Sequence, residues 1–200
     1  DPMQGADPEA LAAIAANLYG LDGLSRERVG GEMIKLLSAS DPVMAVALMA
    51  QCGALARVLP GAVATALGPL TRYEAALGLA PDPLRRLMAM VPRRPRDVQH
   101  MTAHLRLSNA EAGRLTQWAA PALPHVLGLP EKALRGLFYR HGAEAVLDRA
   151  LIEAAYVWAW DGRPFPAWPL KEDVWSDGGN WARGHWLNGR SGLAPLADVV

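Results

Sequence analysis

The chain has 200 residues, of which 51% are hydrophobic and 20% are charged, and its 20 basic residues balance its 20 acidic ones. This composition argues against a largely disordered chain, and the single cysteine, Cys52, excludes an internal disulfide. The longest apolar run, residues 43–50, is far shorter than the roughly 20 residues that span a bilayer, and no leader pattern opens the chain. We therefore expect a soluble, cytoplasmic protein with no membrane partner.

Helix-starting signals recur from the N-terminus onward. Three Asp-Pro pairs each place an N-capping carboxylate before a proline that suits a first helical turn: Asp7-Pro8, Asp41-Pro42 and Asp82-Pro83. Ser108 and Glu111 form a capping box that predicts a helix to about residue 118. Pro130 opens another helix that ends near Gly142, and residues 143–160 suit a long packed helix. Strand patterns are nearly missing, so the predicted fold class is all-α.

The segment LSRERVGGEMIKLL, residues 24–37, predicts a capped amphipathic helix. Ser25 is a good N-cap, and five apolar residues fall on one side at helical spacing: Val29, Met33, Ile34, Leu36 and Leu37. Arg28 and Glu32 are four residues apart, so we expect them to meet on the surface of this helix as an ion pair.

The neighbouring segments give this helix a recognisable context. DPEALAAIAANLYGL (7–21) precedes it, and ASDPVMAVALMAQCGALARVLP (39–60) follows it. Their order resembles the neck domain of the bacterial class II CCA-adding tRNA nucleotidyltransferase and poly(A) polymerase family, specifically over 7–60 and more loosely to about 165. The resemblance implies a neck-like helical domain over 1–62 and a helical body over 63–165. It also implies that Ser25, Arg28 and Glu32 support the nucleotide pocket in a structural role.

From Trp168 onward the composition changes. Tryptophans lie among closely spaced glycines with little helical pattern, so we expect residues 166–200 to form an irregular Trp/Gly-rich tail, and we assign no functional residue there.

Residues 83–106 form a basic stretch that contains six arginines and two histidines but one acidic residue, Asp97. Concentrated positive charge is the electrostatic footprint of phosphate binding. The candidate RNA-binding residues are Arg85, Arg86, Arg93, Arg94, Arg96, His100 and His104. The other interpretation of this stretch is a solvated arginine-rich face.

Catalytic and metal-ligating patterns are missing. Nucleotidyl transfer needs paired carboxylates that hold divalent metal ions, and the chain contains no Asp-x-Asp. His100 and His104 have the spacing of a helical zinc pair, but no glutamate follows His100 and no third ligand is evident. Asp148, Arg149 and Glu153 share one helix, where the five-residue spacing of the carboxylates suits solvated side chains. We therefore predict no catalytic residue and no metal site.

The resemblance implies that Asp1 lies inside a longer protein, whose catalytic head would bind Mg²⁺ and CTP or ATP. This chain would then hold tRNA, at its 3′ end and along the acceptor and T-arm backbone, and would support the head of the same polypeptide. Alone it would be inactive. Either CCA addition or poly(A) addition fits this pattern. An all-helical protein-interaction scaffold without RNA binding is the alternative, and an independent enzyme with an unrecognised site is a weaker third.

Overall fold

The computed structural model describes residues 7–162, and the predicted tail lies outside them. Helices make up its regular structure, and no strand occurs in that range, so the all-α prediction is confirmed. In chain order the helices are α1 (Pro8–Ala16), the 3₁₀ helix η1 (Leu18–Gly23), α2 (Arg26–Leu37), α3 (Val43–Gln51), α4 (Ala54–Val58), α5 (Leu67–Ala76), α6 (Pro83–Met88), α7 (Pro95–His104), α8 (Asn109–Ala119), α9 (Glu131–His141) and α10 (Ala143–Asp161). None of the helices described is both long and apolar enough to cross a membrane.

Predicted side-chain caps begin four of the helices described, α1, α2, α6 and α8. The Asp7 carboxylate accepts a hydrogen bond from the Glu9 backbone N–H, and Ser108 and Glu111 form the predicted capping box at the start of α8. The start of α3 corrects the prediction by one residue. Pro42 occupies the N-cap position, and the Asp41 carboxylate accepts a hydrogen bond from the N–H of Val43 at 3.0 Å. The reason is that the first hydrogen bond of the helix runs from the Val46 N–H to the Pro42 carbonyl at 3.0 Å, which makes Pro42 the N-cap.

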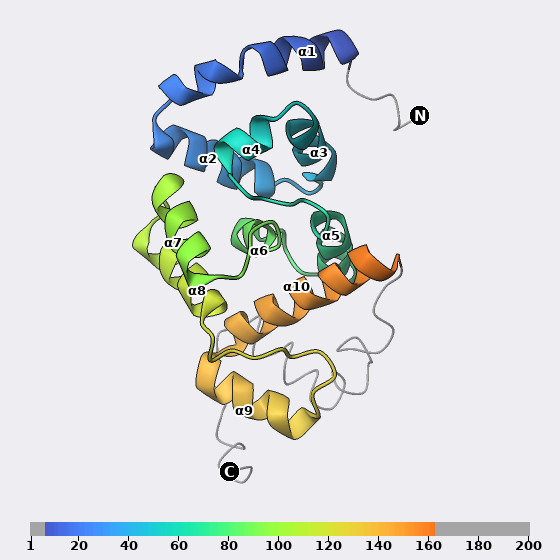
Figure 1. The fold of residues 1–200 in the computed structure, drawn as a ribbon. Helices are drawn as coiled ribbons and strands as arrows, with labels where there is room; N and C mark the ends of the chain where they lie inside the picture. The colour runs from blue at the N-terminus through green and yellow to red at the C-terminus, as the bar shows by residue number, and fades with distance from the viewer. Residues whose placement is uncertain (1–6, 163–200) are drawn as a thin grey trace.

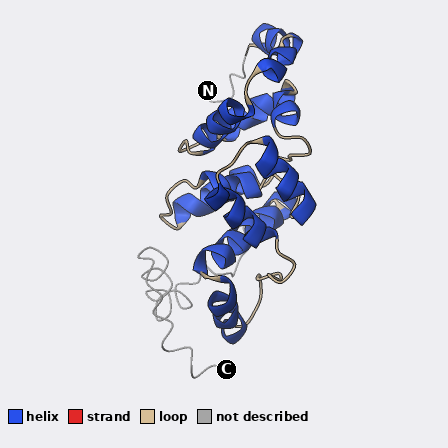
Figure 2. Ribbon diagram, turned by 90° about the vertical axis from the view of Figure 1, so that its left-hand side faces the viewer, coloured by secondary structure: helices blue, strands red, loops and turns tan. Residues whose placement is uncertain are grey.

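The helices are stacked in layers along one axis. In Figure 1, α1 and η1 cross one end of the molecule, α2, α3 and α4 lie beneath them, and α6 lies between α5 and the α7–α8 pair. The long helix α10 crosses below this layer, and α9 lies at the opposite end from α1. Figure 2 shows the same succession of layers after a quarter turn.

One hydrophobic core joins the expected neck to the expected body. Leu37 of α2, Leu67 of α5, Leu87 of α6 and Leu115 of α8 are all 0% exposed and belong to one continuous cluster. A smaller cluster packs α9 against the first half of α10, around Leu134, Leu137 and Val146. Because the larger cluster runs across residue 62, α2 is held firmly against the helices that follow it.

Helix α10 corrects one expectation. Residues 145–155 are all buried, and these include Asp148, Arg149 and Glu153, which are 0%, 7% and 9% exposed rather than solvated. The five-residue spacing does direct the two carboxylates to different sides. Those sides are covered, because α5, α6, α8 and α9 all pack against α10.

Candidate nucleic-acid interface

The two arginines of α6 lie inside the molecule. Arg85 and Arg86 are 6% and 1% exposed. Arg85 Nε donates to Asp148 Oδ1 at 2.8 Å, and Arg86 Nε donates to Glu74 Oε2 at 2.8 Å. Burial contradicts the prediction that these two residues contact RNA. The charge count over residues 83–106 did not include their partner carboxylates, Glu74 of α5 and Asp148 of α10, which lie outside that stretch.

Arg114 of α8 completes this buried network. Its guanidinium donates to both carboxylate oxygens of Asp148 at 2.9 Å, and Nη2 donates to Asp82 Oδ2 at 2.6 Å. Burial opposes the charged forms, but the hydrogen bonds with Asp148 and Asp82 raise the pKa of Arg114 above its usual value. Arg85, Arg86 and Arg114 balance Glu74, Asp82 and Asp148 in formal charge. The network therefore fastens helices together and leaves no positive charge for a ligand.

A backbone contact joins α2 to the end of α7. A Cβ built on Gly30 would lie 2.0 Å from the carbonyl oxygen of Leu105, so no side chain fits at this position. Next to the contact, Arg106 has a left-handed φ of 52°, and its Nε is 3.5 Å from Glu27 Oε1. The close approach places the start of α2 beside the end of the basic stretch.

Helix α7 presents a row of cationic or titratable side chains. Arg96, His100 and His104 follow one another at intervals of four residues, so they share one side of the helix. Arg96 and His100 are exposed and His104 is half-buried, whereas Val98 and Met101 on the other side are buried in the core. Proline at position 95 occupies the first turn, where its missing N–H costs nothing.

The two arginines before α7 have different surroundings. The side chain of Arg94 is 78% exposed, and its Nε lies 3.6 Å from Asp97 Oδ2 in a solvated ion pair. Arg93 is half-buried, with Nε donating to the Trp118 carbonyl and Nη2 to the carbonyls of Ala120 and Leu123, all within 2.6–2.7 Å. Arg93 therefore fixes the end of α8 to the connector that follows it.

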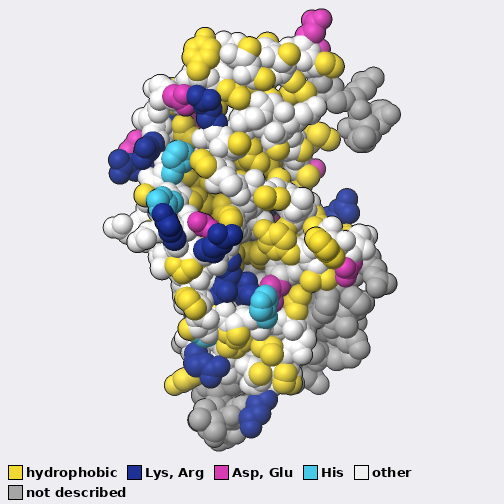
Figure 3. Space-filling view, viewed as in Figure 1, with side chains coloured by type: hydrophobic (Ala, Val, Ile, Leu, Met, Phe, Trp, Pro, Cys, Tyr) yellow, Lys and Arg dark blue, Asp and Glu magenta, His cyan; other side chains and the backbone are white. Residues whose placement is uncertain are grey.

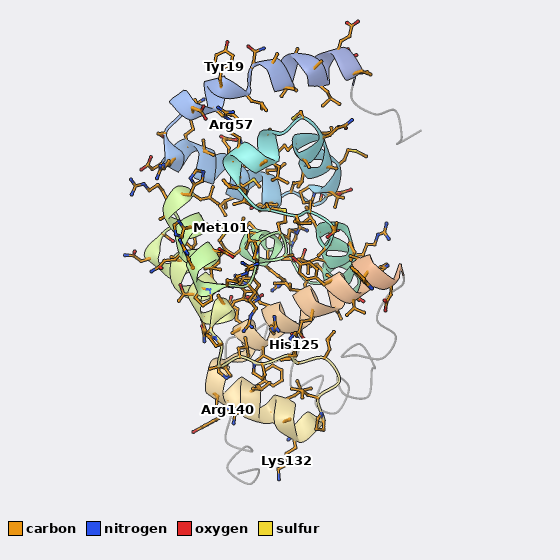
Figure 4. The ribbon with its side chains drawn as sticks, in the orientation of Figure 1. Tyr19, Arg57, Met101, His125, Lys132 and Arg140 are labelled. Carbon is orange, nitrogen blue, oxygen red and sulfur yellow. The ribbon has the colours of Figure 1, made fainter. Side chains whose placement is uncertain are left out.

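Basic side chains form a column on the face of the molecule seen in Figure 3. Figure 3 shows Lys, Arg and His side chains following one another in a column, from the level of α2 and α7 down to α9. Figure 4, in the same orientation, places Arg57 near the upper end of this column and His125, Arg140 and Lys132 in its lower part. We call this column the basic face. The sequence analysis did not include Lys132 and Arg140 of α9, although both lie in or beside the helix predicted after Pro130.

The predicted neck residues lie on α2. Ser25 is the N-cap, and its Oγ accepts from the Arg28 backbone N–H at 3.2 Å, as predicted. Arg28 and Glu32 are both exposed, and no ion pair joins them in the described structure. An ion pair between long exposed side chains adds little stability, because the conformational entropy lost in ordering them offsets most of the electrostatic attraction.

Comparison with known proteins concerns the first four α-helices. Residues 6–65 match a family model described as "Probable RNA and SrmB- binding site of polymerase A". We call residues 6–65 the polymerase A segment, after the family model that they match. The polymerase A segment contains α2 with Ser25, Arg28 and Glu32, and it supports the resemblance to a C-terminal part of a poly(A) polymerase or CCA-adding protein. No curated protein matches the chain significantly.

The polymerase A segment ends before the basic helix begins, yet the two are in direct contact. Gly30 of the segment meets the carbonyl of Leu105, and Glu27 pairs with Arg106. The segment is also joined to α6, because the buried Arg86 donates its Nη1 to the carbonyl of Leu37 at 2.8 Å. The family segment and the row of α7 are thus parts of one surface.

Proposed function

We propose that this chain binds RNA as the C-terminal portion of a poly(A) polymerase or CCA tRNA nucleotidyltransferase. The observation that carries the proposal is the contact between the polymerase A segment and the helix that bears the row Arg96, His100 and His104. The family description supports RNA as the partner of the segment. The adjoining basic face supplies the charge that such a partner needs.

The basic face suits recognition of the RNA backbone. The row on α7 extends over about 12 Å, which is eight residues of helical rise. Phosphates along a nucleic-acid strand recur several times within that length, so successive cations can each meet one. Contacts of this kind position the RNA and leave its base sequence unread. We therefore expect binding that depends on RNA shape and weakens strongly with salt.

The finer part of the proposal names the RNA and the reaction. We propose tRNA, held along its acceptor and T-arm backbone, with its 3′ end directed to a catalytic head that carries the metal-binding carboxylates. Arg94, Arg96, His100 and His104 are the residues proposed for RNA contact. Arg28 and Glu32 are proposed to face the nucleotide-selecting part of the enzyme, since both are exposed at the surface of the polymerase A segment. A cytoplasmic location belongs to the same proposal.

One observation favours a protein-interaction scaffold as a second candidate. Helix α1 has no buried residue, and Ile14 and Tyr19 are 49% and 68% exposed on α1 and η1. Exposed apolar side chains on adjacent elements are a common feature of protein-binding surfaces. They lie at the end of the molecule away from α9.

The test is fluorescence anisotropy of a labelled tRNA transcript that lacks its 3′ CCA, titrated with the chain at low and at moderate salt. A single-stranded RNA of the same length is the comparison ligand. Tighter binding to tRNA that weakens with salt supports the proposal. Equal binding to both RNAs would leave RNA binding and remove the tRNA assignment. Failure to bind either RNA at low salt would overturn RNA binding and favour the scaffold.

A further inference from the structure

A second cluster of charged side chains lies lower on the basic face. His125, in the connector between α8 and α9, has 87% of its side chain exposed, whereas the side chains of Arg149 and Glu153 of α10 are 8% and 9% exposed. His125 Nδ1 is 2.8 Å from Glu153 Oε1 and 3.0 Å from Arg149 Nη2. An exposed imidazole is therefore anchored through one nitrogen to two buried ions, and the rest of its ring faces solvent.

The carboxylate beneath the ring accepts hydrogen bonds through Oε2, whereas its buried Oε1 makes ion-pair contacts but no hydrogen bond. Glu153 Oε2 accepts from the backbone N–H groups of Val126 and Leu127 at 2.9 and 3.2 Å, and Oε1 forms an ion pair with Arg149. Backbone donors and an arginine stabilise the ionised form of a carboxylate. Glu153 thus provides one fixed negative charge to this cluster.

Two arginines share that single negative charge. Arg149 Nε donates to the Pro124 carbonyl at 3.2 Å, and Arg93 bonds three carbonyls through Nε and Nη2. The Nη1 group of each arginine has no hydrogen-bond partner among the described residues. Each guanidinium therefore has one amino group that can donate to a ligand.

The cluster has an excess of positive charge. Arg93 and Arg149 against Glu153 leave one net positive charge with His125 neutral, and two with it protonated. Burial, followed by repulsion from Arg149, lowers the pKa of Arg93. Repulsion between partly buried like charges is relieved when an anion binds between them. No acidic group other than Glu153 is paired with His125, Arg93 or Arg149 in the described range.

We propose that His125, Arg149 and Arg93 form a phosphate-binding subsite that takes one phosphodiester of an RNA backbone. The subsite rests on the proposed function, because its position selects the ligand: α7 lies above it on the basic face and Lys132 and Arg140 of α9 lie below it. A strand that runs from α7 to α9 crosses the subsite. The exposed imidazole of His125 can add a ring N–H donor to the phosphate beside the two guanidinium groups.

The first experiment compares His125→Gln with wild type by RNA anisotropy at low salt. His125 is exposed, so the variant should fold. We expect wild type to bind about fivefold to tenfold more tightly than the variant, because the phosphate loses a ring donor. Arg72→Gln is the control, because Arg72 is exposed on α5, on the opposite side of α6 from α7, and its loss should leave the affinity close to wild type. Equal affinities of wild type and His125→Gln would overturn the subsite.

The second experiment follows the ring NMR signals of His125, identified by their loss in His125→Gln. Movement of these signals with a short RNA supports the subsite, and no movement overturns it. Inorganic phosphate is the separate arm. Movement with phosphate and not with RNA would overturn the assignment to a phosphodiester backbone in favour of a small phosphate ligand. If wild type binds no RNA, the proposed function fails on the anisotropy alone, and the phosphate arm still decides whether an anion site exists.

Discussion

Arg86 of α6 donates its Nη1 to the carbonyl oxygen of Leu37, the last residue of α2, at 2.8 Å. The same guanidinium bonds Glu74 of α5 and the carbonyl of Ala39. One side chain therefore satisfies two carbonyls at and just after the end of α2 and ties them to α5 and α6. These bonds join the polymerase A segment to the helices beyond it.

Replacing Arg86 should destabilise the whole molecule. In Arg86→Gln the buried carboxylate of Glu74 loses its closest cation and the Leu37 carbonyl loses its donor, so we expect a loss of about 3–5 kcal/mol in the free energy of unfolding. Urea unfolding followed by circular dichroism measures it. Arg57→Gln is the control, since Arg57 pairs with Asp22 at an exposed site and its loss should leave the stability close to wild type. A loss below about 1 kcal/mol for Arg86→Gln would contradict the assigned role.

Asp82 should make stability depend on acid. Burial acts to raise its pKa, but hydrogen bonds from Arg114 and the Arg85 backbone outweigh burial and hold the pKa of Asp82 below its usual value of 3.8. A carboxylate with a lowered folded-state pKa stabilises the fold above its unfolded pKa, and that contribution is lost as pH falls through the folded-state value.

The matching variant is Asp82→Asn, which keeps a capping oxygen at the start of α6. We expect it to lose about 1–3 kcal/mol at neutral pH, because Arg114 and Arg85 lose a charged partner. The difference from wild type should begin to shrink below about pH 4, where Asp82 of the unfolded chain gains its proton, and it should disappear as pH falls through the lower folded-state pKa. Urea unfolding at a series of pH values tests this. A difference that stays constant down to the most acidic point would show that Asp82 contributes only as a cap.

Two adjacent glycines of α2 should respond in opposite directions to alanine. Gly30→Ala places a methyl group against the Leu105 carbonyl, so α2 and α7 must separate, and we expect a loss of about 1–3 kcal/mol. Gly31 is exposed, and a methyl group added there would have no atom within 4 Å, so Gly31→Ala should gain about 0.5–1 kcal/mol from helix propensity. Thermal unfolding of the two variants provides the comparison, and equal effects would refute the close contact.

Arg96 should account for part of the salt dependence of RNA binding. Arg96→Gln removes one exposed charge from the row on α7, so the slope of log affinity against log salt should fall by about 0.7–0.9. Arg72→Gln is the matched control, because Arg72 is exposed on α5, on the opposite side of α6 from α7. Anisotropy titrations at several salt concentrations give both slopes. Equal slopes for the two variants would show that RNA binding depends on the total charge of the protein and not on the position of Arg96 on α7.

Local signals sufficed wherever a residue and its partner lie within one turn of each other. Ser25, Asp82 and Ser108 were recognised as caps because a capping side chain bonds an N–H two or three residues away. The apolar periodicity of residues 29–37 likewise predicted which side of α2 would be buried. The same local reasoning failed for Arg85, since its partner Asp148 is 63 residues away and nothing near Arg85 indicates it.

The sequence by itself determined the all-α class, several helix starts and the polymerase A segment, because helix signals and family motifs lie within short stretches of chain. The tertiary structure decided which charges remain available. It buried Arg85 and Arg86 against carboxylates from other helices, left Arg96 and His100 exposed, and brought Arg93, His125 and Arg149 together from three separate segments. Burial and charge pairing depend on distances between helices, and those distances exist only once the core has packed.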